Sequence, residues 1–295
     1  MRPQFDWNLG TRSLPLGRRT LVMGIVNVTP DSFSDGGLYL DTSRAVEHAL
    51  RLHDEGADMV DVGGESTRPG AKAEAVSVQQ ELDRVLPVIQ NVKRARPDAV
   101  VSVDTSKAIV ARACVEAGAE IVNDVSGGLW DEAMLRTLAT LECGVVLMHM
   151  RGRPEEWRTL PPIGDAVAVV KQGLRERSDA SVRAGIGTSC IVLDPGFGFG
   201  KSFDENYPLL ARFEQFHELG YPLLAGVSRK SFLGRTLAHR DTQVTAELAP
   251  VSERLHGTLA AEAVLVLKGA HIIRTHDVRA CLDAVRIADA ILAAT

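Results

Sequence analysis

Eight short runs of apolar, mostly β-branched residues recur along the whole chain, and this repetition constrains the fold more than any other feature. The runs do not alternate between apolar and polar residues, which is typical of strands buried on both faces in a parallel sheet. They occupy residues 21–26, 59–62, 100–103, 120–122, 145–148, 190–193, 222–227 and 271–273.

Amphipathic patterns of helical period lie between these runs, for example at 45–54, 81–93, 109–117, 166–183 and 253–268. Alternation of strand and helix eight times over predicts an α/β protein with a single (β/α)8 barrel, the TIM barrel. An open, doubly wound sheet is the structural alternative. We expect residues 1–19 to form a hairpin or irregular lead-in and residues 20–295 to form one catalytic domain.

Composition and charge narrow the class of protein. The chain has 295 residues, 45% of them hydrophobic and 24% charged, and a net charge of −5, which speaks against a nucleic-acid binder. Neither a membrane span nor a signal peptide is expected, because no apolar stretch is long enough and the first residues are polar. The four cysteines form no CxxC pair, so we expect free thiols and a cytoplasmic protein.

The active site of such a barrel lies at the C-terminal ends of its strands, so the polar residues that follow each run are the candidates. Any one of them could simply cap a helix or fix a turn, but eight in succession indicate a functional rim. The candidates are Asn27, Glu65, Thr67, Arg68, Asp104, Asn123, Asp124, His149, Asp194, Ser228, Arg229, Lys230, Arg274, Thr275 and His276.

The mixture of side chains at this rim indicates a ligand that is both flat and anionic. Asp104, Asp194 and Asn123 can pair with the edge of a nitrogen heterocycle through charge-assisted hydrogen bonds. A second group, Arg68, Arg274 and His276, suits a phosphate or diphosphate, which barrels of this kind often bind near their last strands. Asn27 offers an uncharged oxygen to a hard cation such as Mg²⁺.

Three long connections, residues 29–41, 63–77 and 234–250, are rich in Gly, Pro, Ser and Asp, and long loops of this kind are usually functional. The glycine-rich segment 196–202 is not a P-loop, because Pro195 stands where the first glycine is needed. The histidines lack metal-binding spacing, and His149 has both a structural and a functional interpretation.

Seven ordered blocks resemble the signatures of the dihydropteroate synthases, a pterin-binding family. The first block, MGIVNVTPDSFSDGG, spans residues 23–37, and the second, GGESTRPG, spans residues 63–70. The resemblance runs from about residue 20 to the C-terminus. The other blocks are SVDTS at 102–106, NDVSGG at 123–128, LDPGFGFGK at 193–201, GVSRK at 226–230 and IRTHDV at 273–278.

The resemblance implies a transferase of folate biosynthesis that joins a dihydropterin diphosphate to p-aminobenzoate. Its implied catalytic residues are Asp104, Lys230, Arg274 and His276. The pterin would be held by Asp104, Asn123, Asp194 and Lys230, with Met148 packing on it and Arg274 stacking on its ring. The diphosphate would be held by Thr67, Arg68, Arg274, His276 and a Mg²⁺ bound to Asn27, and p-aminobenzoate would contact Phe199 and Ser228 beneath Phe33 and Pro69 on two mobile loops.

The resemblance further implies an SN1-like reaction, in which the diphosphate leaves before the amine attacks. Sulfonamides would mimic p-aminobenzoate, and a homodimer would form through late helices. Two alternatives remain: a corrinoid-dependent methyltransferase, which needs the pterin site but no diphosphate site, and a non-catalytic paralogue that only binds a ligand or partner.

Overall fold

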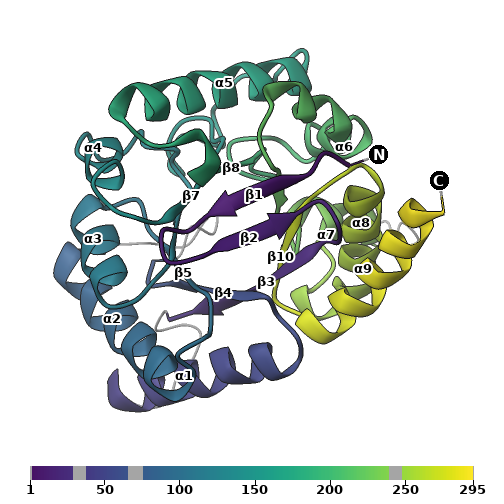
Figure 1. The fold of residues 1–295 in the computed structure, drawn as a ribbon. Coiled ribbons are helices and arrows are strands. Elements are labelled where there is room, and N and C mark those ends of the chain that lie inside the picture. The colour runs from purple at the N-terminus through teal and green to yellow at the C-terminus, as the bar shows by residue number, and fades with distance from the viewer. Residues whose placement is uncertain (1, 29–37, 66–75, 239–247, 295) are drawn as a thin grey trace.

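The computed structural model describes residues 2–28, 38–65, 76–238 and 248–294, and within these ranges eight parallel strands close into a barrel surrounded by helices (Figure 1). The closure confirms the predicted (β/α)8 barrel over an open doubly wound sheet. The barrel strands are β3 (Leu21–Asn27), β4 (Met59–Gly63), β5 (Val101–Asp104), β6 (Ile121–Asp124), β7 (Gly144–Met148), β8 (Ile191–Asp194), β9 (Leu224–Ala225) and β10 (Ile272–Thr275).

The hydrogen-bonded order of the strands is β8-β7-β6-β5-β4-β3-β10-β9, and a bridge between Leu193 and Leu223 completes the ring. Each barrel strand leads into an outer segment that carries the chain back to the next strand, and most of these segments are helical. The helices are α1 (Leu38–Asp54), α2 (Val78–Ala95), α3 (Ala108–Glu116), α4 (Met134–Leu138), α5 (Ala166–Ala184), α6 (Asn206–Ala211), α7 (Ser231–Leu237), α8 (Leu255–Leu267) and α9 (Val278–Ala293), with 3-10 turns η2 (Thr188–Cys190), η3 (Phe213–Leu219) and η4 (Val251–Glu253).

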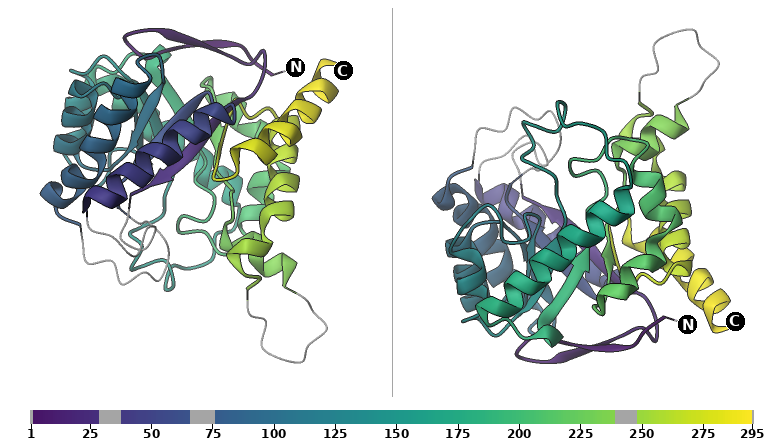
Figure 2. Two further views of the ribbon diagram at one scale, coloured as in Figure 1. Left: turned by 90° about the horizontal axis from the view of Figure 1, so that it is seen from below. Right: turned by 90° about the horizontal axis from the view of Figure 1, so that it is seen from above.

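A short antiparallel hairpin covers the N-terminal end of the barrel. It consists of β1 (Phe5–Asn8) and β2 (Ser13–Leu16), and the side views place it across that end, opposite the loops that follow the strands (Figure 2). Trp7, Leu9 and Leu16 are buried against the interior residues of the barrel. The indole Nε1 of Trp7 donates a hydrogen bond to the Cys190 carbonyl oxygen at 2.8 Å. The lead-in is therefore a plug that is part of the core.

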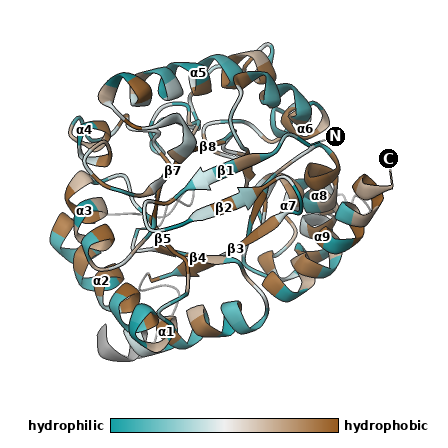
Figure 3. Ribbon diagram, in the orientation of Figure 1, coloured by the Kyte–Doolittle hydropathy of each residue, from teal (hydrophilic) through white to brown (hydrophobic). Residues whose placement is uncertain are grey.

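The barrel has two apolar layers because successive side chains of each strand point to opposite faces. Leu21 and Met23 point into the barrel and join the hairpin, whereas Val22 and Val26 point outward and pack under the helices. The helix surfaces that face solvent are largely hydrophilic, while α8 and α9 show more hydrophobic colouring (Figure 3). The interior is thus a filled core, and the hairpin closes it at the N-terminal end.

The structure differs from the predicted elements mainly near the ends of the long connections. Helix α1 begins at Leu38, inside the predicted loop 29–41, and α7 continues to Leu237, inside the predicted loop 234–250. Gly234, the first residue of that predicted loop, lies within α7, and a Cβ there would stand 2.5 Å from Nε of Arg254. The segment 222–227 pairs with β10 only at Leu224–Ala225, and it meets β8 through the bridge between Leu193 and Leu223.

None of the described helices combines the length and apolar character needed to cross a membrane. The four cysteines are free thiols, as predicted, and three of them are buried. The five glycines 56, 118, 185, 220 and 269, each of which follows a helix, have positive φ angles.

Candidate active site

A buried cluster of charged and polar side chains joins four strands at the C-terminal end of the barrel. Arg274 of β10 donates from Nε to Oδ2 of Asp61 and from Nη2 to Oδ2 of Asp104, both at 2.7 Å. Asn123 of β6 donates from Nδ2 to the same Asp61 oxygen at 2.8 Å. We call Asp61, Asp104, Asn123 and Arg274 the central cluster. Its carboxylates share one guanidinium, so their edges are fixed before any ligand arrives.

The carboxyl groups of the central cluster keep hydrogen-bond acceptors that no described residue uses. Burial raises the pKa of Asp104 to about 7; the charge of Arg274 opposes this rise and Asp61 adds to it. Burial also acts to lower the pKa of Arg274, but Asp61 and Asp104 outweigh that effect and raise it. Oδ1 of Asp61 is buried without a hydrogen-bond partner among the described residues. A ligand that donates hydrogen bonds and carries positive character would complete this cluster.

A second charged pair lies beside the central cluster. Asp194 ends β8 and accepts a hydrogen bond from the Gly196 amide at 2.7 Å; burial raises its pKa, and Lys230 opposes the rise. Burial lowers the pKa of Lys230 to about 7, while Asp194 opposes this and Arg274 adds to it. The Lys230 ammonium donates to the Phe197 carbonyl oxygen and lies 4.4 Å from the centre of the Phe199 ring. The two charged groups therefore influence each other across one site.

An apolar wall adjoins these charges. Met148 belongs to a small buried cluster with Val125 and Met150, and Phe199 packs against it together with Trp130 and Trp157. The Trp157 and Phe199 rings meet edge to face with their centres 5.6 Å apart. Polar edges next to flat apolar side chains are suited to an aromatic heterocycle, because such a ring has a polar rim and apolar faces.

The third part of the site lies around His276, which follows β10. Ser228 Oγ is 2.9 Å from His276 Nδ1 and accepts a hydrogen bond from the His276 amide at 3.2 Å. His276 and Asn27 both line a hollow of about 480 Å³, whose outer wall is formed by residues of α1 that include Arg44 and Arg51. This hollow combines two arginines and His276 with the uncharged amide of Asn27 and one carboxylate, Glu47, so cationic donors that suit a phosphate ligand are present.

Comparison with known proteins agrees with this geometry. Residues 23–276 match the family model described as "Pterin binding enzyme". The chain belongs to this family of pterin-binding enzymes. It is 45% identical to the dihydropteroate synthase of Escherichia coli strain K12 over 92% of each chain.

The chain has the same fold as solved structures of dihydropteroate synthases. The Xanthomonas albilineans enzyme with 4-aminobenzoic acid superposes with a TM-score of 0.86 at 44% identity, covering 99% of both chains. The same enzyme in complex with 7,8-dihydropteroate gives a TM-score of 0.83 at 42% identity, again over 99% of both chains. Within its family, the chain is therefore a dihydropteroate synthase.

The structure brings together the predicted site residues that it describes, at the end of the barrel where the sequence predicted them. These are Asn27, Asp104, Asn123, Met148, Asp194, Phe199, Ser228, Lys230, Arg274 and His276. Four other candidates, Phe33, Thr67, Arg68 and Pro69, lie outside the described residues. The geometry adds one feature to the expected roles: the guanidinium of Arg274 is already committed to Asp61 and Asp104.

Two residues that adjoin the site were missed by sequence reasoning. Asp61 lies inside the apolar run of β4, and a carboxylate in such a run was itself the available signal. Lys201, in the segment that resembles a P-loop, donates from Nζ to the carbonyl oxygens of Gly196 at 2.7 Å, His149 at 3.1 Å and Phe199 at 3.3 Å. Burial lowers its pKa strongly. Lys201 thus holds the backbone around Phe199 instead of binding a phosphate.

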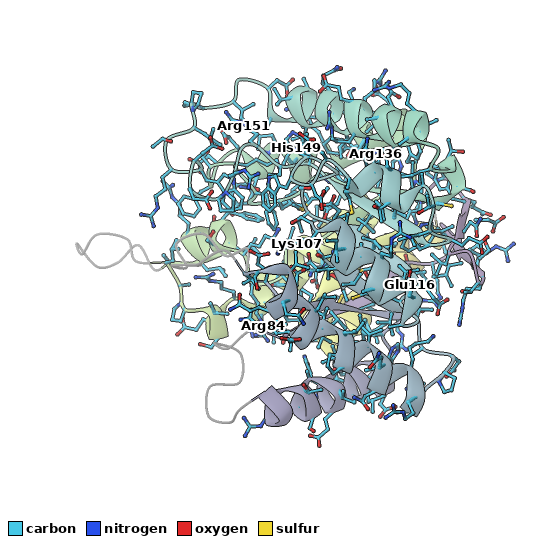
Figure 4. The ribbon with its side chains drawn as sticks, turned by 90° about the vertical axis from the view of Figure 1, so that its left-hand side faces the viewer. Arg84, Lys107, Glu116, Arg136, His149 and Arg151 are labelled. Carbon is cyan, nitrogen blue, oxygen red and sulfur yellow. The ribbon has the colours of Figure 1, made fainter. Side chains whose placement is uncertain are left out.

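Other strand-end candidates have structural contacts. Glu65 pairs with Lys107 Nζ at 2.5 Å, and Lys107 also reaches buried Glu81 of α2. Arg84, which is labelled with Lys107 in Figure 4, donates from Nη1 to the Gly64 carbonyl oxygen at 2.7 Å. Asp124 accepts from the amides of Ser126 and Gly128 and so fixes a turn. The His149 ring is packed against Gly173 of α5, and burial lowers its pKa to about 2.

Arg229, between Ser228 and Lys230, has the positive φ angle of 57° that side chains rarely adopt. Its amide donates to Thr258 Oγ1 at 3.0 Å, and its carbonyl oxygen accepts from Arg254 Nη1 at 2.9 Å. Its guanidinium also forms two hydrogen bonds with the Asp277 carboxylate, at 2.9 and 2.5 Å. Such strain persists only where surrounding contacts impose it, and here it sets the directions of the site residues on either side.

Proposed function

We propose that this chain condenses (7,8-dihydropterin-6-yl)methyl diphosphate with p-aminobenzoate, giving 7,8-dihydropteroate and diphosphate. The observation that carries this assignment is the central cluster, in which Asp61 keeps an unpaired oxygen beside Asp104 and Asn123. These acceptors match the amino and ring N–H groups along the edge of a pterin. Membership of the dihydropteroate synthases makes the enzyme a transferase of folate biosynthesis.

The site divides between the parts of the two substrates. Asp104, Asn123, Asp194 and Lys230 grip the pterin, and Met148 supports its face. The guanidinium plane of Arg274 stacks on the same ring. His276, Arg274, Thr67 and Arg68 hold the diphosphate. Phe199 and Ser228 line the p-aminobenzoate site, which Phe33 and Pro69 close.

Asn27 fits a Mg²⁺ ion that is held mainly by its substrate. The described residues contain no group of three or more His, Cys, Asp and Glu side chains able to hold a metal on their own. Asn27 offers one hard oxygen at the hollow that it shares with His276, so diphosphate oxygens and water would supply the other ligands. When bound, Mg²⁺ neutralises negative charge on the leaving diphosphate.

The charges of the chain favour a reaction in which bond breaking leads. Arg274 and His276 stabilise the diphosphate as the bond from its oxygen to the methylene carbon breaks and both electrons leave with the oxygen. Asp104 and Asp194 stabilise the positive charge that spreads from the methylene into the pterin. The amine of p-aminobenzoate then attacks the methylene carbon and loses a proton to solvent, so no strong general base is required.

Oxygen exchange tests this order of events. Substrate labelled with ¹⁸O at the bridging oxygen should move the label into non-bridging positions of recovered substrate when the enzyme and Mg²⁺ are present and p-aminobenzoate is absent. Absence of label movement, under conditions where bound diphosphate can rotate, contradicts the stepwise path and favours direct displacement by the amine.

Product formation tests the activity itself. The purified chain with both substrates and Mg²⁺ should release dihydropteroate, measured by chromatography, and Asp104→Asn should lower kcat/KM by about 100-fold or more. Asp83→Asn, on the exposed side of α2, is the matched control and should match the wild type. Methyl transfer from methyltetrahydrofolate to a corrinoid supports the methyltransferase alternative, and tight pterin binding without any turnover supports the non-catalytic one.

We also propose a homodimer formed through α8 and α9. Val264 and Leu267 of α8 and Ile287 and Ile291 of α9 are between 40% and 66% exposed, and α8 is apolar on nearly all sides. A helix apolar all round needs a cover beyond its own domain. Light scattering should give the mass of two chains, and Ile287→Glu should give that of one, whereas Ile109→Glu on α3 should leave the dimer intact.

Three further assignments follow from the same proposal. The four free thiols support a reducing cytoplasm as the location. Sulfonamides, which share the aryl amine and an acidic group with p-aminobenzoate, should compete with it at Phe199 and Ser228. Residues 20–295 act as one catalytic domain, to which residues 1–19 are the lead-in.

A further inference from the structure

The segment that leaves β9 carries two site residues but has little strand pairing beneath it. We call residues 226–230 the β9 exit. β9 pairs with β10 over its two residues only, whereas the other pairs along the ring, from β8 round to β10, each extend over three residues or more. On its other side the segment meets β8 at the bridge between Leu193 and Leu223. Ser228 and Lys230 lie beyond this pairing, so other contacts fix their directions.

Arg229, between these two residues, makes contacts that strand pairing does not supply. Its amide donates to Thr258 Oγ1 at 3.0 Å, and its carbonyl oxygen accepts from Arg254 Nη1 at 2.9 Å. Both partners are buried, one at the N-cap of α8 and the other within that helix. They hold Arg229 at a φ of 57°, a conformation that a residue with a side chain keeps only where its surroundings impose it. Helix α8 therefore sets the course of the β9 exit.

The side chain of Arg229 ties the β9 exit to the neighbouring one. We call residues 276–277, which follow β10, the β10 exit. Arg229 donates from Nε to Oδ2 of Asp277 at 2.9 Å and from Nη2 to Oδ1 at 2.5 Å. A contact at two points fixes the relative orientation of both groups as well as their distance. The two exits joined in this way carry three residues of the site: Ser228, Lys230 and His276.

Two simpler explanations fit these contacts less well. An arginine at the rim could bind the leaving diphosphate directly, but this guanidinium is already committed to a carboxylate through Nε and Nη2. An ordinary surface ion pair is the other explanation. Such a pair would not need the strained backbone that Thr258 and Arg254 maintain at Arg229.

We propose that Arg229 and Asp277 are positioning residues, whose ion pair holds the β9 exit against the β10 exit and so places Ser228 and Lys230 relative to His276. The proposal rests on the proposed function, which assigns those three side chains to the substrates. Neither Arg229 nor Asp277 touches a substrate. They act through the chain segments to which the site residues belong.

Single and double variants test whether the two residues act as one unit. Arg229→Met removes the donors and keeps the length of the side chain, and Asp277→Ala removes the carboxylate without removing a side-chain cap from α9. Each should lower kcat/KM for both substrates by about tenfold, because a displacement of about 1 Å can cost about 100-fold in rate. The double variant should be no slower than the slower single variant. Two losses that multiply contradict the joint role.

Exchanging the charges tests the ion pair itself. Arg229→Asp alone and Asp277→Arg alone each place two like charges together, so each should be slower than Arg229→Met. Aspartate is among the side chains that occur most often at positive φ, so the exchanged pair can form on the same backbone. The double exchange should be faster than either single exchange. If it is not, the pairing is not the cause of the loss; if the exchanged chains do not fold, the first set of variants decides.

A second pair at the opposite end of the barrel is the matched control. Arg19 donates to the two carboxylate oxygens of Asp58 at 2.9 and 2.5 Å, and this pair is also partly exposed, but it lies just before β3 and β4, where no site residue is assigned. Arg19→Met should leave kcat and both KM values unchanged. Both Arg19→Met and Arg229→Met should lower the melting temperature by about 2–4 °C or less, because partly exposed ion pairs contribute little to stability.

Activity and stability together separate positioning from a merely structural role. A loss of activity in Arg229→Met, at a melting temperature like that of Arg19→Met, supports positioning. Activity that falls only in step with melting temperature across these variants overturns it. Calorimetry with inorganic diphosphate tests direct binding: if Arg229→Met weakens this binding and Asp277→Ala does not, Arg229 contacts the substrate and the proposal is wrong.

The outcome also distinguishes this proposal from the assigned activity. Turnover by the wild-type enzyme is measured first, and its absence contradicts the assigned activity itself. Turnover that is indifferent to Arg229→Met and Asp277→Ala leaves that activity standing and overturns the role of the pair.

Discussion

The two ends of the same barrel are built from opposite kinds of side chain. At the N-terminal end, Trp7 and Leu16 of the hairpin close over Met23 and Met59 in an apolar layer. Two residues further along β4, at Asp61, the interior turns into a cluster of charges that lacks full hydrogen bonding. The difference teaches that apolar burial at one end stabilises the fold, whereas the incompletely bonded charges at the other end destabilise it and serve ligand binding.

The largest expected effect comes from removing the shared cation at the charged end. Arg274→Met leaves Asp61 and Asp104 as neighbouring buried carboxyls and removes a donor for the diphosphate. We expect kcat/KM to fall by about a thousandfold or more, equivalent to ~4 kcal/mol of barrier. Steady-state kinetics measure this, and a loss below tenfold contradicts a central role for the cluster.

Removing one large side chain at the apolar end should lower the stability of the fold and leave catalysis unchanged, in contrast to Arg274→Met. Trp7→Ala removes a fully buried ring and its bond to Cys190. The free energy of unfolding should fall by about 3–4 kcal/mol, measured by urea titration, with kcat and KM within twofold of wild type at 15 °C. Trp7→Phe keeps most of the apolar contact and should lose less. A marked change in KM contradicts the separation of the two ends.

Replacing the buried ammonium should make the charged end more stable and less active. The folded pKa of Lys230 is lowered to about 7 from an unfolded value near 10.5, so its contribution to stability is present above pH 10.5 and is lost as pH falls to 7. Lys230→Met has no ammonium to bury, so it does not lose stability in this way as the pH falls. Its unfolding free energy, measured from pH 7 to 10, should therefore depend less on pH than that of the wild type, while turnover falls. If the unfolding free energies of the wild type and the variant change with pH in parallel, burial of Lys230 is not the cause of the pH dependence.

The smallest effect is expected from a polar contact beside the hairpin. Thr11 Oγ1 donates to Glu120 Oε2 at 2.7 Å, but Arg12 and Lys93 also bind that carboxylate. Thr11→Val should cost about 1 kcal/mol or less of unfolding free energy and leave activity unchanged. A loss as large as that of Trp7→Ala shows that the hairpin depends on polar contacts more than on apolar burial.

The sequence predicts the repeated strand–helix units better than it predicts which side chains contact one another. Unbroken apolar runs such as those of β3 and β7 identify the barrel strands because both of their faces are buried. Asp61 was missed because the candidates are the polar residues that follow each apolar run, whereas Asp61 lies inside the run MVDVG. Helices α4 and α6 are too short to show a helical period.

The sequence predicts most of the described residues at this rim, but neither Asp61 nor the contacts between them. Strand-end positions identify Asp104, Ser228 and His276, because every parallel strand delivers its last residues to one rim. Pairing between Ser228 and His276, or between Asp61 and Arg274, spans 48 and 213 positions along the chain and depends on the closed ring. A local pattern contains no information about such distant partners.

The way the hairpin is fastened has a consequence for synthesis of the chain. Arg2 donates to Thr20 and to the Ala270 carbonyl oxygen, and it pairs with Asp289 of α9 across 287 positions at 2.6 Å. A ribosome that adds about 5–20 residues per second delivers Asp289 some 15–60 s after Arg2. Arg2 therefore waits for a partner made 287 positions later, and this fastening of the apolar end of the barrel cannot form until α9 has been synthesised.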